Sequence, residues 1–440
     1  MTIQYPVNAP VFDITVDLTP GTVAIVSLPA PASLDWAPDE VRNNAVHVFA
    51  EDAFGVYMVN LRDFRSDAAL ALPIAALGTA YVVIDYGTTF APVLPEVNST
   101  NQFLAYAVED STTVTIVPVA DLTGGHPAGV PFDVLLNRGE GYYAESVSPF
   151  PNLTGTTVSS SRPFGLTNGN KCTFIPEGNP FCDHIFEVAQ PVQTWGMQVF
   201  VGSLPNQPDG TVYRIVASED GTTVSQDGTA IGTIDLGEFI EVGPSPFIHI
   251  FSADKPIFVT QYMIGVDPGI GDPSMGNVIP PEQYLSSYVF STVGGSQFSE
   301  HFITVIAEDA DLATIELDEV PIGAGNFTSI PGSGFSGVHL SISEGVHCTS
   351  SNGVHGITVH GYNLDDSYLY PGGVSFSVPC PGDANGDGTV DPLDSGFVLA
   401  RFGCSYPEDG ENCLNADVNG DEAVDPLDSG FVLARFGPCP

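Results

Sequence analysis

Short runs of apolar residues, separated by Gly, Pro and acidic residues, fill most of the chain. Val, Ile, Thr and Phe crowd these runs, and their alternation with polar residues has the two-residue period of half-buried strands. Runs with the period of a helix are confined to the C-terminal tail. The pattern predicts a mainly β fold, with several β-sandwich or barrel-like units in tandem and a small α-helical module at the end.

Two sequence features recur along the β region. The first is an apolar run, a Glu-Asp pair and an alternating run, which predicts a β-hairpin with the acidic pair at its turn. Its copies begin at Val46, Phe103, Tyr213 and Ile303. The second is a polar run followed by an apolar run, which predicts a turn and a strand. Its copies begin near Ser159, Ser252 and Ser350.

The N-terminus and the spacing of these features predict the organisation of the chain. Residues 11–18 and 22–28 read as two strands joined by a turn at 19–21. We predict a β-rich region over 1–378 and a separate module over 379–440. Within the β region, the predicted units are 1–100, 101–182, 183–280 and 281–378.

An acidic pattern of twelve residues occurs twice in the tail, as DANGDGTVDPLD at 383–394 and DVNGDEAVDPLD at 417–428. Oxygen donors spaced in this way allow a short loop to surround Ca²⁺, so we predict two calcium ions. The predicted ligands are Asp383, Asn385, Asp387, the Thr389 carbonyl, Asp391 and Asp394, and then Asp417, Asn419, Asp421, the Ala423 carbonyl, Asp425 and Asp428. Position 6 is Gly388 in the first loop but Glu422 in the second, so we expect the second site to be weaker.

Each loop is followed by the same apolar stretch, SGFVLARFG, and no apolar helix precedes it. Two loop-plus-helix units in tandem resemble a type I dockerin domain, and this resemblance implies a cohesin-like protein partner. Dockerins often carry small hydroxyl residues at loop positions 10 and 11, where they help to recognise the cohesin. This chain has Pro-Leu at these positions in both loops, so the resemblance does not imply the partner specificity of known dockerins. The predicted partner-binding residues are Pro392, Leu393, Arg401, Pro426, Leu427 and Arg435.

The chain carries ten Lys and Arg residues against 53 Asp and Glu, a formal net charge of −43. Such a surface repels nucleic acid and anionic membranes. No apolar run is long enough to span a membrane. No signal peptide is visible at residues 1–4, and we expect a mature extracellular or cell-surface chain from which it has been removed.

Seven cysteines favour an oxidising compartment. Cys172 and Cys182 enclose a short loop, and Cys404 and Cys413 enclose the connection between the calcium units. We expect both pairs to form disulfides, and a third disulfide, Cys380–Cys439, to clasp the ends of the tail. Cys348 is left over, and burial is its expected state.

Several ordered motifs lie between about residues 46 and 373. They include CDHIFEVAQPVQTWG from Cys182, VYRIVASEDGTTV from Val212, PPEQYLSSYVFST from Pro280 and DSYLYPGG from Asp366. Together they resemble the N-terminal domain family of the IgG Fc-binding protein. The resemblance implies a secreted, β-rich, non-enzymatic module for binding or adhesion.

No catalytic motif stands out, so no catalytic residue is predicted. The sequence contains no nucleophile elbow, phosphate loop or dinucleotide fingerprint. Our leading hypothesis is a secreted bacterial structural or adhesive protein, whose β region binds a protein or surface and whose calcium-folded tail docks to a partner. One alternative is a self-assembling subunit of an extracellular fibre, joined by strand addition through residues 11–18. Another is a dockerin-borne enzyme acting on polysaccharide.

Overall fold

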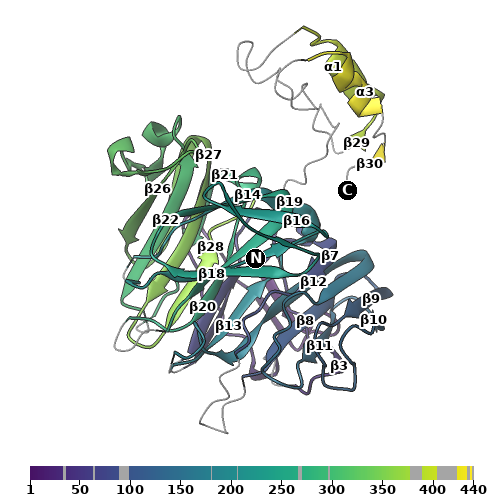
Figure 1. Ribbon diagram of the computed structural model, residues 1–440. Coiled ribbons are helices and arrows are strands. Elements are labelled where there is room, and N and C mark those ends of the chain that lie inside the picture. The colour runs from purple at the N-terminus through teal and green to yellow at the C-terminus, as the bar shows by residue number, and fades with distance from the viewer. Residues whose placement is uncertain are drawn as a thin grey trace. The chain divides into compact units, whose positions relative to one another are not determined.

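The computed structural model describes residues 1–32, 36–62, 65–88, 99–179, 181–205, 207–265, 270–295, 298–376, 389–403, 424–433 and 437–438. The chain divides into two compact units, Met1–Ser375 and Phe376–Pro440. We call them the β body and the tail. Figure 1 draws the β body from purple to green and the described helices of the tail in yellow. The finer unit boundaries predicted from the sequence stay predictions.

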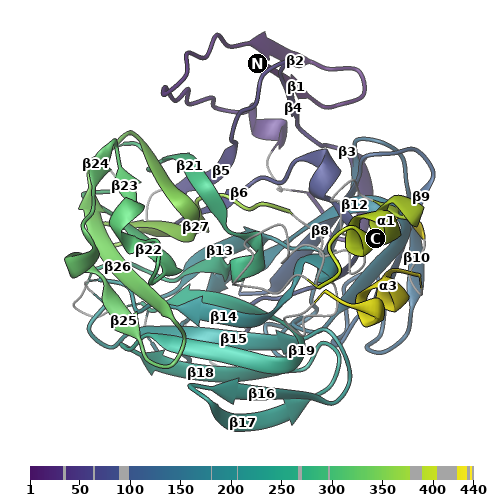
Figure 2. The same ribbon diagram turned by 90° about the horizontal axis from the view of Figure 1, so that it is seen from above.

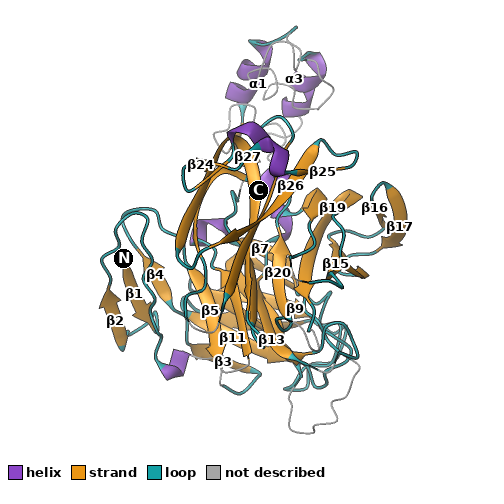
Figure 3. Cartoon of the chain, turned by 90° about the vertical axis from the view of Figure 1, so that its left-hand side faces the viewer, coloured by secondary structure: helices purple, strands orange, loops and turns teal. Residues whose placement is uncertain are grey.

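Strands make up nearly all of the regular structure in the described part of the β body, which confirms the mainly β fold (Figure 3). Its other regular elements are short 3-10 turns: η1 (Ala30–Ala32), η2 (Ile74–Ala76), η3 (Val192–Thr194), η4 (Pro281–Gln283), η5 (Leu312–Thr314) and η6 (Ala324–Asn326). The described α-helices are both in the tail, α1 (Pro392–Leu399) and α3 (Pro426–Leu433).

Three large antiparallel sheets form the β body. The first contains β3 (Glu40–Asn43), β7 (Gly78–Val82), β8 (Asn101–Ala107), β9 (Thr112–Val117), β10 (Phe132–Leu136), β11 (Glu140–Glu145), β12 (Thr157–Thr173) and β13 (Asp183–Val188). The second contains β14 (Gly196–Val201), β15 (Thr211–Ala217), β16 (Thr222–Gln226), β17 (Thr229–Ile234), β18 (Phe239–Ser245), β19 (His249–Met263) and β20 (Ser274–Val278). The third contains β21 (Leu285–Ser291), β22 (Glu300–Glu308), β23 (Glu316–Leu317), β24 (Val320–Pro321), β25 (Thr328–Ile330), β26 (Phe335–Ile342), β27 (Val346–Tyr362) and β28 (Ser367–Pro371).

The three sheets repeat one strand order. It runs β10-β9-β12-β8-β11 in the first sheet, β17-β16-β19-β15-β18 in the second and β24-β23-β27-β22-β26 in the third. In each sheet one long strand, β12, β19 or β27, also pairs with the strand that opens the repeat and the strand that closes it. The recurring motifs of the sequence therefore mark a repeated sheet.

The predicted Glu-Asp hairpins are wrong. Strands β8 and β9 flank Glu109-Asp110, but both run antiparallel to β12 and pair with successive stretches of it, Phe164–Asn170 and then residues 157–160. The chain therefore passes the acidic pair without reversing direction. The same holds for β15 and β16 along β19, and for β22 and β23 along β27. In the first copy, which begins at Val46, β4 and β5 belong to different sheets.

The predicted polar turns are also wrong. The run that begins near Ser159 lies inside the long strand β12, where the register with β7 shifts between Ser159 and Phe164. The runs near Ser252 and Ser350 lie inside β19 and β27, beside register shifts of the same kind. An irregularity of this kind bends a strand and locally disrupts its ladder without ending it. The polar residues therefore mark a bend in a continuous strand.

The N-terminal residues form a small sheet of their own, in the order β2-β1-β4. It consists of β1 (Thr2–Tyr5), β2 (Phe12–Thr15) and β4 (His47–Phe49). The predicted strand at 11–18 corresponds to β2, but residues 22–28 form no strand. Strand β2 therefore pairs with the preceding strand, β1, and not with the following residues. A separate hairpin, β5 (Tyr57–Arg62) and β6 (Arg65–Leu70), follows.

Consecutive repeats interlock through close contacts at glycine. The turn η3, which begins the second repeat, packs on β7 of the first, and η4 packs on β14 of the second. A Cβ on Gly78 would lie 2.5 Å from Cβ of Pro191, and one on Gly196 would lie 2.5 Å from Cβ of Pro280. Only glycine permits this approach, so the repeats are fixed on one another.

Four strands, β6, β13, β20 and β28, meet at the centre of the β body, and we call them the closing strands. Strand β6 contacts β13 and β28, and β20 contacts the same two, so the four close into a ring. Figure 2 shows the sheets arranged around β6 and β13. Each sheet buries its own apolar cluster, around Phe103 and Phe164, Tyr213 and Phe251, and Ile303 and Tyr368.

Candidate calcium-binding and docking site

The two halves of the tail are related by an internal twofold pattern. Strand β29 (Thr389–Val390) pairs with β30 (Gly437–Pro438), so that Val390 lies opposite Gly437. In the other half Gly403 donates its N–H to the carbonyl of Val424 at 2.9 Å. Helices α1 and α3 have the same sequence, PLDSGFVL, and pack on each other. Repeated sequence therefore folds into repeated structure.

An aspartate starts each tail helix. Asp391 accepts a hydrogen bond from the N–H of Leu393 at 2.6 Å, and its own N–H donates to Asp394 Oδ2 at 2.8 Å. Asp425 and Asp428 repeat both bonds, at 2.6 and 2.7 Å. Proline at the first helical position suits such a start, because its fixed φ is helical and it has no N–H to satisfy. Loop positions 9 and 12 are thus joined by a hydrogen bond in each half of the tail.

The structure describes part of the predicted calcium set. Thr389, Asp391, Asp394, Asp425 and Asp428 lie within the described residues. The other predicted ligands, Asp383, Asn385, Asp387, Asp417, Asn419, Asp421 and Ala423, lie outside them. Among the residues that the structure describes, no group of three or more His, Cys, Asp or Glu side chains could hold a metal ion.

The described carboxylates fit a hard cation. Asp394 and Asp428 are 0% exposed, although a carboxylate is costly to bury without compensating charge. Oxygen is the donor that Ca²⁺ prefers. Asp394 and Asp428 would hold the ion at position 12 of each loop, with Asp391 and Asp425 beside them at position 9. A bound calcium ion would place positive charge beside these buried carboxylates.

The predicted docking residues differ in accessibility. Leu393 is 67% exposed and Leu427 is 66% exposed, and Pro392 and Pro426 are exposed beside them. Arg401 is half-buried: its guanidinium carbon lies 3.4 Å from the ring centroid of Phe397, and its Nη1 donates to the Phe397 carbonyl at 3.0 Å. Arg435 lies outside the described residues.

One predicted disulfide can be seen. Cys172 and Cys182 are bonded, and they tie the end of β12 to the start of β13. Cys348 is a free thiol of intermediate exposure on β27, so the expected burial is not found. Cys380, Cys404, Cys413 and Cys439 lie outside the described residues.

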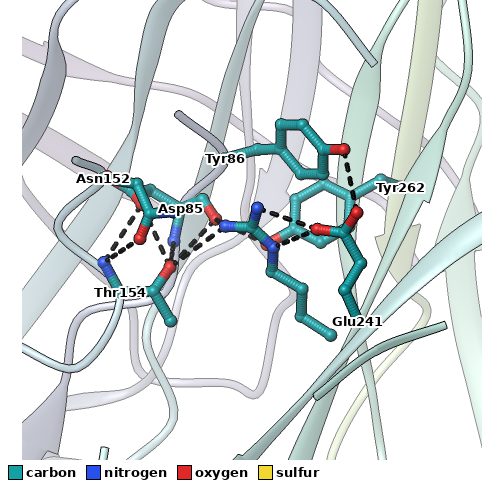
Figure 4. Close-up of polar contacts among 7 residues, drawn as sticks. Asp85, Tyr86, Asn152, Thr154, Glu241 and Tyr262 are labelled. Atoms are coloured by element: carbon teal, nitrogen blue, oxygen red, sulfur yellow. Dashed lines mark hydrogen bonds and ion pairs between the residues drawn. The ribbon is translucent and has the colours of Figure 1, made fainter. Parts of the chain in front are cut away.

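A buried arginine, Arg214, links the second sheet to loops of the first repeat. It lies in the motif that begins at Val212, but the sequence predicted no role for it. Figure 4 labels residues that surround it, among them Asp85, Thr154 and Glu241. Arg214, on β15, donates from Nε and Nη2 to Glu241 Oε2 at 3.0 and 2.9 Å. Its Nη1 donates to the carbonyl of Asp85 at 2.5 Å and to Thr154 Oγ1 at 3.3 Å, both from the first repeat. The guanidinium also lies 4.1 Å from the centroid of the Tyr86 ring. Burial raises the pKa of Asp85 to about 6, although Arg214 opposes the rise.

Buried carboxyl groups join the closing strands. Asp67 accepts hydrogen bonds from Ser274 Oγ at 2.6 Å and from the backbone N–H groups of Phe186 and Met275 at 3.1 and 3.2 Å, so it links β6 to β13 and β20. Burial raises the pKa of Asp67 well above its usual range. Burial likewise raises the pKa of Asp183 to about 9, with Asp272 nearby adding to the rise. With a pKa of about 9, Asp183 is in its neutral form at pH 7.

Comparison with known proteins confirms both resemblances. The IgGFc binding protein family model matches residues 67–361, and the dockerin type I domain model matches residues 381–436. The chain is 25% identical to the human IgGFc-binding protein over 328 residues, which are 73% of this chain and 6% of the human protein. It therefore spans a small fraction of that relative. No solved structure matches.

None of the helices in the described part of the chain has the length and apolar character that crossing a membrane requires. Dockerin type I domains bind calcium, which agrees with the acidic loops of the tail.

Proposed function

We propose that this chain, which belongs to the IgGFc-binding protein family and ends in a type I dockerin domain, is an extracellular binding protein of bacterial origin. The β body would hold a protein or surface ligand, and the tail would dock the chain to a cohesin-like partner. The human relative is named for binding the Fc part of IgG, and from it we take only that the body binds protein. The family supports a binding role.

The observation that carries the docking proposal is an apolar arc on each tail helix. In α1 the exposed side chains lie on one side of the helix, opposite the buried Asp394 and Val398. The arc of α1 comprises Pro392, Leu393, Gly396 and Leu399, followed by Ala400. Pro426, Leu427, Gly430 and Leu433 repeat it in α3. In a chain of net charge −43, an exposed face without a single charge marks a protein-interaction surface.

A glycine lies in the middle of each arc. A Cβ added to Gly396 or Gly430 would meet nothing within 4 Å, so packing inside the tail does not require glycine at either position. Glycine in a helix interior costs about 0.5–1 kcal/mol relative to alanine. We infer that the missing side chain lets the backbone of the partner approach the helix closely. The partner surface would be apolar, with positive charge around it to complement the acidic tail.

Calcium would act by linkage. It binds the folded loops and not the unfolded ones, so the ion concentration outside the cell stabilises the docking face. The fibre and polysaccharide-enzyme hypotheses receive no comparable support. Strand β2 lies at the edge of its small sheet, where strand addition could occur, but this position alone does not favour a homopolymer.

Binding of the full chain to a panel of cohesin modules tests the proposal. With calcium present we expect saturable binding to at least one module. The double substitution Leu393→Asp and Leu427→Asp should weaken that binding by at least about 100-fold, because two apolar anchors would become charged. Val289→Asp, on an exposed strand position of the β body, serves as the control and should bind like the unaltered chain. Binding that survives the double substitution would contradict the docking face.

A further inference from the structure

A serine, a histidine and an aspartate of the second sheet are hydrogen-bonded in series. Ser245 Oγ lies 2.7 Å from His249 Nε2, and His249 Nδ1 lies 2.8 Å from Asp227 Oδ2. Ser245 ends β18, His249 begins β19, and Asp227 lies in the turn between β16 and β17. Three separate segments thus create the arrangement in which an imidazole takes a proton from a hydroxyl and a carboxylate orients the imidazole.

The contacts of His249 favour the tautomer in which Nδ1 carries the proton. An ionised carboxylate only accepts, so Nδ1 donates to Asp227 and Nε2 of the neutral ring accepts from Ser245. Asp227 is held in turn, because its Oδ1 accepts the N–H of Ile250 at 2.9 Å. The amide nitrogen of Gln226 lies 3.1 Å from Nδ1 and 3.4 Å from Nε2, in each case farther away than the oxygen of Asp227 or Ser245. His249 is buried, so its ring is fixed in this orientation.

The third sheet offers an internal comparison. There His347 Nδ1 lies 2.7 Å from Asp318 Oδ2, and Asp318 Oδ1 accepts the N–H of Cys348 at 2.9 Å. His347 Nε2, however, lies 2.9 Å from the carbonyl oxygen of Ser343 and 3.4 Å from its Oγ. A carbonyl only accepts, so this Nε2 must donate, and the ring has no nitrogen left to take a proton.

The repeated Asp–His pair therefore braces a turn against a long strand in both sheets. Of the two histidines, only His249 has a ring nitrogen that can accept a proton from a hydroxyl group, that of Ser245. The surroundings of that hydroxyl are open: Ser245 is half-buried, Pro244 and Pro246 beside it are exposed, and Phe247 is 68% exposed. A site this open is accessible to an ester on the surface of a larger molecule, and the exposed ring of Phe247 offers apolar contact to its acyl group.

We propose that Ser245 is an activated nucleophile that accepts an acyl group from such an ester. Ser245 Oγ attacks the carbonyl carbon while its proton passes to His249 Nε2. The carbon–oxygen bond to the alcohol then breaks, and Nε2 returns the proton to the departing oxygen. A water molecule hydrolyses the acyl-serine by the same proton transfers. Ser245 and His249 are the catalytic residues, and Asp227 is a positioning residue. The proposal is independent of calcium and of the tail.

Reaction of the full chain with a fluorophosphonate probe, followed by peptide mass spectrometry, tests the proposal. We expect an adduct on Ser245 that Ser245→Ala abolishes. Asp227→Asn should lower the maximal labelling rate at least about tenfold, because an amide at this position favours the other tautomer of His249. The probe concentration for half-maximal rate and the melting temperature should not change, since asparagine tolerates the left-handed backbone (φ 51°) and can still accept the N–H of Ile250.

Ser343→Ala is the matched control, and it should leave labelling unchanged, with no adduct on Ser343 in the unaltered chain. Two results would overturn the proposal: labelling of Ser245 no stronger than that of Ser343, or an undiminished rate in a folded Asp227→Asn variant. Because none of the three substitutions touches the tail, cohesin binding should be the same in all these variants.

Discussion

The β body and the tail use carboxyl groups in opposite ways. In the β body, Asp67 and Asp183 are buried and accept hydrogen bonds from backbone N–H groups. Burial raises the pKa of both carboxyl groups, that of Asp183 to about 9, so Asp183 is a neutral acid at pH 7. In the tail, Asp394 and Asp428 are just as buried but lie in loops whose composition suits a cation. The β body is held by its own apolar clusters, whereas the described core of the tail centres on a few valines. A core of that size rarely sustains a fold without a metal or a disulfide.

This difference implies opposite responses to conditions. The tail should fail when calcium is removed or when its carboxylates are protonated, because either change removes the ion. The β body should be indifferent to calcium and should weaken when its neutral acids are forced to ionise.

The largest expected effect is the loss of calcium at position 12. Asp394→Ala with Asp428→Ala should weaken calcium binding by at least about 100-fold, since breaking a buried charge pair costs about 3–5 kcal/mol. Isothermal titration calorimetry of the full chain measures this change. Asp409→Ala, which lies in neither twelve-residue pattern, is the control. Unchanged affinity in the double variant would remove position 12 from the ligand set.

The next effect is on the β body. Arg214→Met should lower its free energy of unfolding by roughly 2–4 kcal/mol, because the Asp85 carbonyl and Thr154 lose their donor and Glu241 loses its partner. Chemical denaturation followed by fluorescence measures the change. Arg162→Met breaks an exposed pair with Glu109 and should cost less than about 1 kcal/mol. Equal losses of stability in the two variants would mean that the buried contacts of Arg214 contribute no more than an exposed ion pair.

The pH dependence should be smaller but diagnostic. Asp183 and Asp272 have pKa values raised to about 9 and about 8, mainly by burial. The folded state therefore holds protons that the unfolded state has lost, and the stability of the β body should fall between pH 7 and 9, by up to about 1.4 kcal/mol per pH unit for each group. His355 and His360, whose pKa values burial lowers to about 4 and about 3, are neutral throughout this window.

Denaturation of the β body at pH 7, 8 and 9 measures this slope. Asp183→Asn, which cannot ionise, should reduce it. A β body equally stable at pH 7 and 9 would show that these carboxyls ionise without cost.

The smallest effect concerns the tail helices. Gly396→Ala with Gly430→Ala should stabilise calcium-loaded helices by about 0.5–1 kcal/mol for each substitution, because both positions have open space. The same variant should bind a cohesin partner less tightly, since the added methyl groups keep its backbone away. Circular dichroism melts and the binding assay provide the two readings. A gain in stability without a loss in binding would leave the glycines unexplained.

The sequence predicted the strands better than their pairing. The runs around Glu109-Asp110 were identified as strands with a break, but a local pattern cannot tell a reversal from a strand that continues along the same neighbour. For the same reason, the sequence predicted a turn near Ser159 where the structure has a bend within β12. Twofold repetition and oxygen spacing predicted the tail directly, because a calcium loop is contiguous in sequence.

Sites assembled from segments far apart in the sequence have no contiguous motif that would predict them. Arg214 meets the Asp85 carbonyl across 129 positions of the chain, and Asp67 meets Met275 across 208. Ser245, His249 and Asp227 are nearer in sequence, but the bends and turns that bring them together depend on the sheet. Ser245 and Asp227 lie beside Pro or Gly, and a small polar residue in that context predicts only a turn.

Hydrogen–deuterium exchange of the full chain, in calcium and then in a chelator, tests the central contrast most directly. With calcium at about 100 times its dissociation constant, linkage adds about 2.7 kcal/mol to the tail for each bound ion. We therefore expect peptides from 389–403 and 424–433 to exchange at least about 100-fold faster in the chelator, and peptides from the three large sheets to exchange at the same rate in both. Equal protection of the tail in both conditions, or a loss of protection that spreads through the sheets, would contradict the account.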